Sequence, residues 1–195
     1  MVRLAAALLF CLPPALTARD AVKPPESKVY TMDNDYFSCV IPADWKFTRD
    51  TSYEEEDGIF GIELAAPKSG KAPVLIFVTY YAPGNADFKG HDDFLARNSK
   101  NSLGETKSPT ETYGPVKKAD VGKSKAKGFS LARERKRFLH PEGKSEESVV
   151  LRELMYVVPA AKKGGFHVLH FSAPKADYGK YLPVFRRLSD SFSGL

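Results

Sequence analysis

The C-terminal segment, residues 165–195, most constrains the fold of this chain. It predicts a strand over Phe166–Phe171, a turn over Ser172–Pro174 and then a closing helix. The large side chains of that helix recur at intervals of mostly three or four residues: Tyr178, Tyr181, Leu182, Phe185, Leu188 and Phe192. This spacing aligns them on one helix face, and that face has to be covered by other apolar groups. A strand directly before such a helix favours a helix that packs across a sheet.

The preceding residues supply strands for that sheet. The predicted strands are Tyr36–Ile41, Trp45–Thr48, Gly58–Ala66, Val74–Tyr81, Tyr113–Val121, Lys125–Leu139 and Val149–Val158. Val74–Tyr81 has neither charge nor alternation, which predicts a central strand with both faces covered. Tyr113–Val121 is predicted to be a short edge strand broken by Pro115. With hairpin turns at 140–148 and 162–165 and a further helix at 92–103, the predicted class is α+β: an antiparallel sheet of about seven strands covered by helices.

The N-terminus has the layout of a secretory signal peptide. Arg3 makes the start positive, and the apolar run Leu4–Leu16 is too short to span a bilayer. We therefore expect a signal peptide at residues 1–18, a mobile leader at 19–28 and a single domain at 29–195. The expected localisation is exported, periplasmic or extracellular, with no transmembrane segment. Anchoring to a membrane by a lipid on Cys11 is the alternative.

Loss of the signal peptide changes the charge and the cysteine count. It removes one basic residue, so the formal charge falls from +5 to 28 − 24 = +4. Only Cys39 then remains, and an intramolecular disulfide is excluded. Alternation places Cys39 on the strand face shared by Phe37 and Ile41, which predicts a buried thiol. The remaining length suits one core, and we expect a monomer.

Two motifs resemble those of the PsbP-like group of proteins. The segment Asp35–Trp45 resembles the opening of these proteins, and Leu169–Pro174 with the aromatic residues of the closing helix is similar to their end. The group includes the PsbP extrinsic proteins of photosystem II, the Ran-binding Mog proteins and bacterial DcrB-like envelope proteins. The resemblance implies an α/β/α sandwich without enzymatic activity that binds or assembles other proteins. Functions diverge within the group, and an exported bacterial member best matches the N-terminus of this chain.

The chain contains no recognised catalytic or metal-binding motif. His167 and His170 are three residues apart on a predicted strand, so they face opposite sides and cannot share a metal ion. Gly122–Ser124 lacks the earlier glycine of a phosphate-binding loop, because Lys117 occupies that position. The acid run Glu54–Asp57 lacks calcium-loop spacing, and we expect it in a solvated loop. We therefore expect no catalytic residue, no metal site and no cofactor.

One predicted strand, 125–139, carries the candidate binding surface. Its three alternating arginines share one face, about 7 Å apart, and Phe129 and Leu131 precede them on that face. This pattern predicts a hairpin whose base packs in the core while its outer half projects into water. The candidate partner-binding residues are Lys125, Lys127, Arg133, Arg135 and Arg137.

Such an arginine row suits an acidic protein surface or an anionic envelope component. Nucleic acid is not expected, because no row of aromatic residues for base stacking accompanies the arginines. In the alternative interpretation the row is a solvated face, and Glu153 simply pairs with Arg133 across the hairpin.

The expected function is that of a non-enzymatic exported binding or assembly factor that acts through protein or envelope contacts. The alternative is an extracytoplasmic, hydrolase-type enzyme with an unrecognised site between sheet and helix. A cavity in which ionisable groups with shifted pKa values converge would favour the enzyme.

Overall fold

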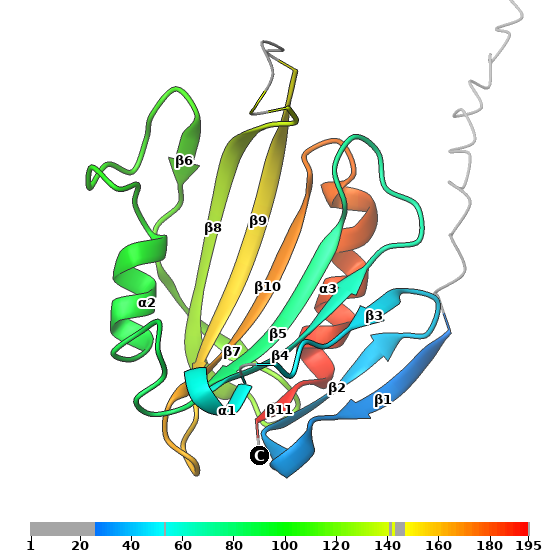
Figure 1. Ribbon diagram of the computed structural model, residues 1–195, viewed down its shortest axis with the longest axis vertical. Coiled ribbons are helices and arrows are strands. Elements are labelled where there is room, and N and C mark those ends of the chain that lie inside the picture. Colours follow the sequence, from blue (N-terminus) through cyan, green and yellow to red (C-terminus); the bar gives the residue numbers. More distant parts are fainter. Residues whose placement is uncertain (1–25, 53, 141, 143–146, 195) are drawn as a thin grey trace, which may run out of the picture.

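The computed structural model describes residues 26–194 except positions 53, 141 and 143–146. The predicted signal peptide and most of the predicted leader lie outside the described residues. Within them, a large and a small antiparallel sheet are covered by helices (Figure 1), which confirms the predicted α+β class. No helix of the described part is both long and apolar enough to cross a bilayer.

The large sheet has the strand order β3-β4-β5-β10-β9-β8-β6, and β7 also pairs with β8. All of its neighbouring strands are antiparallel. The strands are β3 (Lys46–Thr48), β4 (Ile59–Ala65), β5 (Leu75–Tyr81), β6 (Glu111–Tyr113), β7 (Lys117–Val121), β8 (Ala126–Phe138), β9 (Ser148–Pro159) and β10 (Phe166–Pro174). Pro115 separates β6 from β7, as predicted for the edge strand at Tyr113–Val121, because proline cannot donate to the ladder.

The small sheet brings the two ends of the described chain together. It consists of β1 (Ser27–Thr31), β2 (Phe37–Pro42) and β11 (Ser193–Gly194) in the order β1-β2-β11. A single 3₁₀ turn, η1 (Asp33–Asp35), joins β1 to β2. Because β1 starts at Ser27, the prediction of a mobile leader is wrong for its last two residues, which pair with β2.

The closing helix α3 (Tyr178–Ser191) and the small sheet cover one face of the large sheet. Phe185 and Leu188 of α3 are fully buried, and they belong to one core cluster with Phe37 of β2 and Phe171 of β10. The ring centroid of Phe185 lies 5.4 Å from that of Phe171. The predicted helix over a sheet is therefore confirmed, and α3 forms the centre of the main core.

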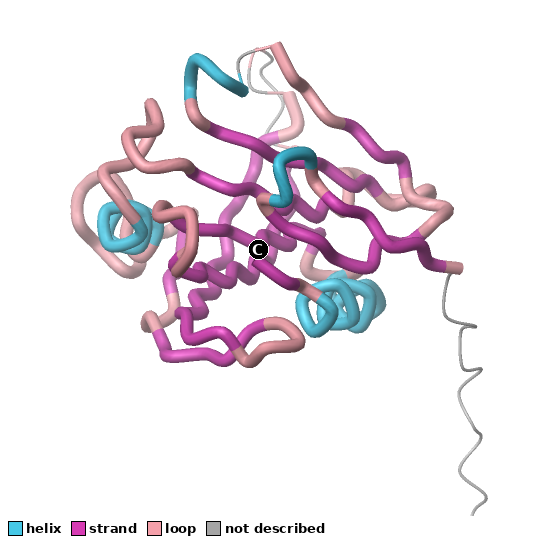
Figure 2. Tube along the Cα trace, turned by 90° about the horizontal axis from the view of Figure 1, so that it is seen from below, coloured by secondary structure: helices cyan, strands magenta, loops and turns pink. Residues whose placement is uncertain are grey.

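The short helix α2 (His91–Asn98) lies against the opposite face of the large sheet (Figure 2). Its Phe94 and Leu95 pack on a second cluster that includes Met155 of β9 and Val168 of β10. Successive side chains of a strand point to opposite faces, so Val168 faces α2 while its neighbour Leu169 belongs to the main core. Since α2 ends at Asn98, the predicted helix at 92–103 is too long, and much of this face lies beyond it.

Two further predictions are corrected by the packing. The acid run Glu54–Asp57 forms a one-turn helix, α1, and Glu54 is buried where it accepts two hydrogen bonds from Arg49, at 2.9 and 2.7 Å. The prediction of a solvated loop is therefore wrong for Glu54. Strand β5 has only one fully buried face: Ile76 and Val78 lie in the main core, whereas the alternate residues are partly exposed. The residues on its second face are also largely apolar, because that face lines a groove on the surface of the sheet.

Candidate functional site

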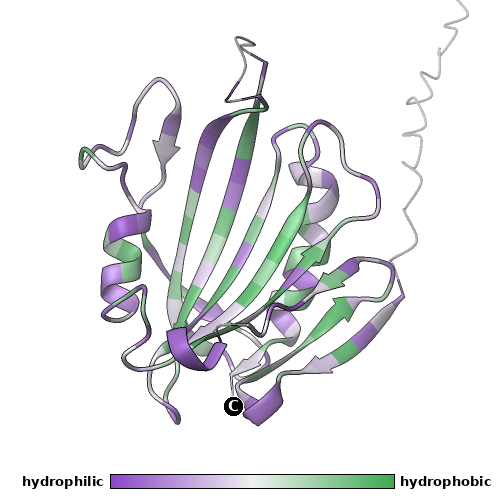
Figure 3. Ribbon diagram, in the orientation of Figure 1, coloured by the Kyte–Doolittle hydropathy of each residue, from purple (hydrophilic) through white to green (hydrophobic). Residues whose placement is uncertain are grey.

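A groove with a volume of about 450 Å³ lies on the face of the large sheet that α2 covers only in part. Strands β5, β8, β9 and β10 form its floor, and α2 with the segment before it forms one wall. Figure 3 shows that β5 is largely hydrophobic, whereas the upper part of β8 is hydrophilic. The groove therefore combines an apolar floor with a polar end.

The strand register places the polar and apolar residues in neighbouring cross-strand rows. One row runs across β8, β9, β10 and β5 as Arg133, Glu153, Ser172 and Leu75. The next row, towards α2, consists of Leu131, Met155, His170 and Phe77. All these side chains share one face because each row is two residues further along every strand. Arg135 and Arg137 continue this face outwards from α2.

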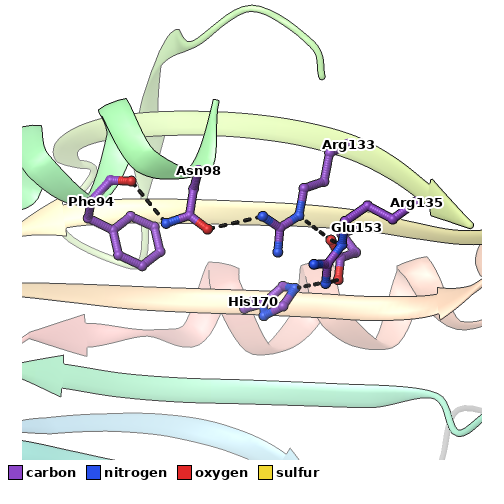
Figure 4. Close-up of polar contacts among 6 residues, drawn as sticks. All are labelled: Phe94, Asn98, Arg133, Arg135, Glu153 and His170. Carbon is purple, nitrogen blue, oxygen red and sulfur yellow. Dashed lines mark hydrogen bonds and ion pairs between the residues drawn. The ribbon is translucent and has the colours of Figure 1, made fainter. Parts of the chain in front are cut away.

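The carboxylate of Glu153 is the centre of the polar end (Figure 4). Glu153 is 2% exposed, and its Oε2 accepts hydrogen bonds from the Nε of Arg133 and, at 3.1 Å, from the Nε of Arg135. The Nη2 of Arg135 donates to Oε1 at 2.9 Å, which makes this pair bidentate. The Nε2 of His170 lies 3.4 Å from Oε1. One buried carboxylate thus binds two guanidinium groups and contacts an imidazole.

This surrounding keeps Glu153 ionised. Burial by itself raises the pKa of a carboxyl group, but the contacts with His170, Arg133 and Arg135 outweigh it and hold the pKa of Glu153 well below its ordinary value. A carboxylate in this state is a poor proton acceptor at neutral pH. Its main effect is to orient the two arginines.

Helix α2 is tied to the same network by Asn98. The Nη1 of Arg133 donates to Asn98 Oδ1 at 3.0 Å, and Asn98 Nδ2 donates to the carbonyl oxygen of Phe94 at 3.0 Å. The Arg133 side chain is only 10% exposed. Arg133 therefore connects the last turn of α2 to strand β8 by a hydrogen bond, beside the open part of the groove.

The two histidines of β10 face opposite sides, as predicted. His170 faces the groove, where its ring stacks on Phe77 with centroids 5.6 Å apart. His167 is 1% exposed on the other face, and its Nε2 lies 2.9 Å from the carbonyl oxygen of Tyr36. Burial lowers the pKa of His167, so its neutral form is favoured. The described residues include no group of three or more histidines, cysteines or acids able to hold a metal ion.

The structure divides the five predicted binding residues into two sets. Arg133, Arg135 and Arg137 all line the groove. Lys127 is 85% exposed near the other end of β8, about 20 Å from Arg133 along the strand, and forms an ion pair with Asp120 at 2.8 Å. Lys125 lies exposed in the turn between β7 and β8. The two lysines are therefore not part of the arginine surface.

The prediction that the outer hairpin projects into water needs a correction for the first two arginines. The side chains of Arg133 and Arg135 are 10% and 38% exposed, because both bind Glu153. Only Arg137 is fully on the surface, and no ion pair joins it to another described residue. The predicted pairing of Arg133 with Glu153 is confirmed.

The prediction of binding residues left out most of the groove lining, including Phe77, Asn98, Glu153 and His170. One of them is recognisable in the sequence. Glu153 lies in phase with Leu151 and Met155 on a strand whose alternate residues are buried. An acidic residue in a buried phase requires a cationic partner, and the arginines of the preceding strand are the nearest candidates.

The comparisons with known proteins concern the fold. Neither the protein-family models nor the curated proteins include a match to this chain. Among solved structures, the chain is similar to the solution structure of cyanobacterial PsbP (CyanoP) from Synechocystis sp. PCC 6803, with a TM-score of 0.53. The similarity covers 92% of this chain and 99% of that chain at 11% sequence identity. The protein therefore has a PsbP-like fold.

Proposed function

We propose that this protein is an exported, non-enzymatic binding or assembly factor that engages an acidic part of a partner protein through the groove beside α2. One observation carries the proposal: the arginines of β8 border a groove with an apolar floor instead of forming an isolated solvated row. Arginine beside apolar and aromatic surface is the composition that protein interfaces favour at their centres.

The charge of the groove supports an acidic partner. Its lining contains Arg133, Arg135 and Arg137 against Asp87 and Glu153, which gives a formal charge of 3 − 2 = +1 without counting His170. The exposed positive charge lies at the outer end, where a partner approaches. Complementary charge at such a position steers the encounter and fixes the register of binding.

Two lines of support concern export and assembly. The N-terminal residues 1–18 have the layout of a secretory signal peptide. The sequence motifs at the two ends of the domain resemble a group that includes bacterial DcrB-like envelope proteins and the Mog proteins. On this proposal the protein is an extracytoplasmic member of that group.

An extracytoplasmic enzyme is the second candidate function, and one observation favours it. Glu153 and His170 are ionisable groups in contact within a groove, with the pKa of Glu153 strongly shifted. The direction of that shift supports binding instead. A general base is most effective with a pKa near the working pH, whereas the contacts with His170, Arg133 and Arg135 lower the pKa of Glu153.

Site-specific photocrosslinking in the native cell tests the proposal. A photoreactive amino acid replaces Leu75, at the edge of the groove, and in a control it replaces Val150, which is 40% exposed on the opposite face of β9. We expect one partner protein to be captured from position 75 only, and Arg137→Glu to remove that adduct. Equal adducts from both positions, or none, contradict the proposal.

The same experiment separates the two candidate functions. If the captured protein is cleaved or chemically altered by the wild-type protein and left intact by Glu153→Gln, the protein is an enzyme. If the captured protein is unaltered in both, binding alone accounts for the adduct.

A further inference from the structure

We infer that the groove binds an extended peptide segment that presents one carboxylate and, about four residues away on the same side, one aromatic side chain. The inference rests on the proposed function and specifies the chemistry of the partner. It follows from the two ends of the groove, one of which has unneutralised guanidinium groups while the other has an open aromatic surface.

The cationic end has more positive charge than Glu153 can neutralise. One carboxylate faces two guanidinium groups, so Arg133, Arg135 and Glu153 together have a net charge of 2 − 1 = +1. The neighbouring Arg137 adds a further exposed charge without an ion pair to any other described residue. Glu111 of β6 lies opposite Arg135 and lines a neighbouring pocket with Arg137, so three arginines face two acids and the balance is 3 − 2 = +1. This balance suits a single carboxylate from a partner.

Arg135 is already oriented for that carboxylate. Its Nε and Nη2 are held by Glu153, whereas its Nη1 makes no hydrogen bond within the described part of the chain. A guanidinium group has five N–H donors in a fixed plane, so the donors of Nη1 are directed away from Glu153. The Arg135 side chain is 38% exposed, which leaves this edge accessible. Glu153 is thus a positioning residue, and Arg135 is the residue that contacts the ligand.

The apolar end is a stacked pair of rings. Phe77 and His170 lie with their planes 25° apart, and both line the groove. Phe77 is partly exposed, and Leu75 and Thr79 flank it on the same face of β5. An aromatic side chain of a partner would pack on this surface, since offset or edge-on ring pairs contribute beyond their buried area.

The separation of the two ends sets the spacing in the ligand. Glu153 is on β9 and Phe77 on β5, two strands apart, and neighbouring strands are about 4.8 Å apart. Phe77 also lies one cross-strand row, about 6.6 Å, further along the strands than Glu153. The Arg135 guanidinium group bound at Glu153 and the aromatic surface are therefore about 12 Å apart, which an extended peptide covers in about four residues at about 3.3 Å each, and side chains four residues apart point to the same side of an extended peptide. An open groove with a charged end favours such a segment over a free acyl chain, which needs an enclosed apolar cavity to bury its length.

Fluorescence anisotropy with short labelled peptides tests the inference on the whole mature chain. The probe is a capped peptide with the order Phe-Ser-Ser-Ser-Glu, with its reverse order as a second probe. We expect replacement of its glutamate by glutamine to weaken binding about tenfold, and replacement of its phenylalanine by alanine to do the same. A peptide in which phenylalanine and glutamate are adjacent should bind as weakly as the two substituted peptides.

Variants of the protein locate the site. Phe77→Ala and Arg137→Gln should each weaken binding of the probe by at least about fivefold, while Lys127→Gln, at the far end of β8, should have no effect. Arg137 is exposed and unpaired within the described residues, so its variant keeps the fold even if changes at Arg135 do not. Unchanged affinity in both groove variants overturns the inference.

Two outcomes distinguish this inference from the proposed function. If neither probe binds while crosslinking from position 75 captures a partner protein, the groove binds proteins but the stated peptide chemistry is wrong. If phosphatidylglycerol vesicles bind with dependence on Arg137 and the peptides do not, the anionic group comes from a lipid, and both proposals are overturned.

Discussion

Arg133 and Glu153 face each other across the β8–β9 hairpin, and the guanidinium Nε of Arg133 donates a hydrogen bond to the Glu153 carboxylate in a place where the two side chains are 10% and 2% exposed. Two charges buried this far lose most of their hydration, and their mutual attraction offsets that loss only while both are present. The pair therefore makes β8, β9 and, through Asn98, helix α2 depend on one another.

Removal of one partner should be costly. We expect Arg133→Ala to lower the free energy of unfolding by about 3 kcal/mol, the lower end of the usual range for a broken buried pair, because Arg135 and His170 still contact the carboxylate. Urea unfolding measures this loss. The double variant Arg133→Met/Glu153→Leu should be clearly more stable than additive single changes predict. Simple additivity of the two changes would contradict a coupled pair.

Glu153 should also make the stability depend on pH. The folded protein holds the pKa of Glu153 below its ordinary value of 4.5, so the unfolded chain binds a proton first as the pH falls. The stabilisation from Glu153 is complete above about pH 4.5 to 5 and is lost progressively in more acidic solution. Urea unfolding between pH 3 and 7 should therefore show that the free energy of unfolding falls more steeply with decreasing pH for the wild type than for Glu153→Gln. The control is Glu56→Gln, which removes an exposed carboxylate. If the pH dependence of the free energy of unfolding weakened equally in that variant, Glu153 would be excluded as its cause.

The thiol of Cys39 should be inert in the folded protein. Cys39 is 2% exposed, and burial raises its pKa to about 12, so very little thiolate exists at pH 8. We expect no labelling by iodoacetamide at that pH within the folded protein, and complete labelling in urea, as measured by mass spectrometry of the peptide that contains Cys39. Labelling of the folded protein at the rate of a free thiol would show that this site opens readily.

The turn between β9 and β10 should tolerate no side chain at Gly165. Its φ is +68°, and a Cβ atom there would collide with the carbonyl oxygen of Tyr81 on β5. We expect Gly165→Ala to cost about 1–2 kcal/mol for the left-handed backbone and about 1–3 kcal/mol more for the collision. Gly84→Ala is the matched control, because its φ is +77° with no atom within 4 Å of the added Cβ. Thermal unfolding measures the stability of both variants. Equal melting temperatures for Gly165→Ala and Gly84→Ala would contradict a collision at Gly165.

Much of the secondary structure could be predicted because it depends on local pattern. The aromatic repeat of α3, the alternation around Cys39 and the placement of His167 and His170 on opposite faces follow from the periods of helix and strand. The elements that were missed have weak local patterns. Strand β1 has exposed residues along almost its whole length, and β11 has two residues, so each forms only because β2 is present to pair with it.

The candidate site was predictable only at one end. The arginine row follows from alternation along β8, but its environment depends on which strand lies opposite and which helix lies above. The register of β8 with β9 decided that Glu153 meets Arg133, and the shortness of α2 decided that the face beyond it stays open. Neither property is encoded within a window of a few residues.

By itself, then, the sequence determined the α+β class, the closing strand and helix, the buried thiol and the presence of three arginines on one strand face. These depend on side-chain periodicity, which acts over a few residues. Only the tertiary structure decided that two of these arginines are bound to one buried carboxylate, that Lys125 and Lys127 lie apart from them, and that an aromatic floor adjoins them. The physical reason is that cross-strand neighbours come from residues far apart in the chain, and burial then sets the charge state and accessibility of each group.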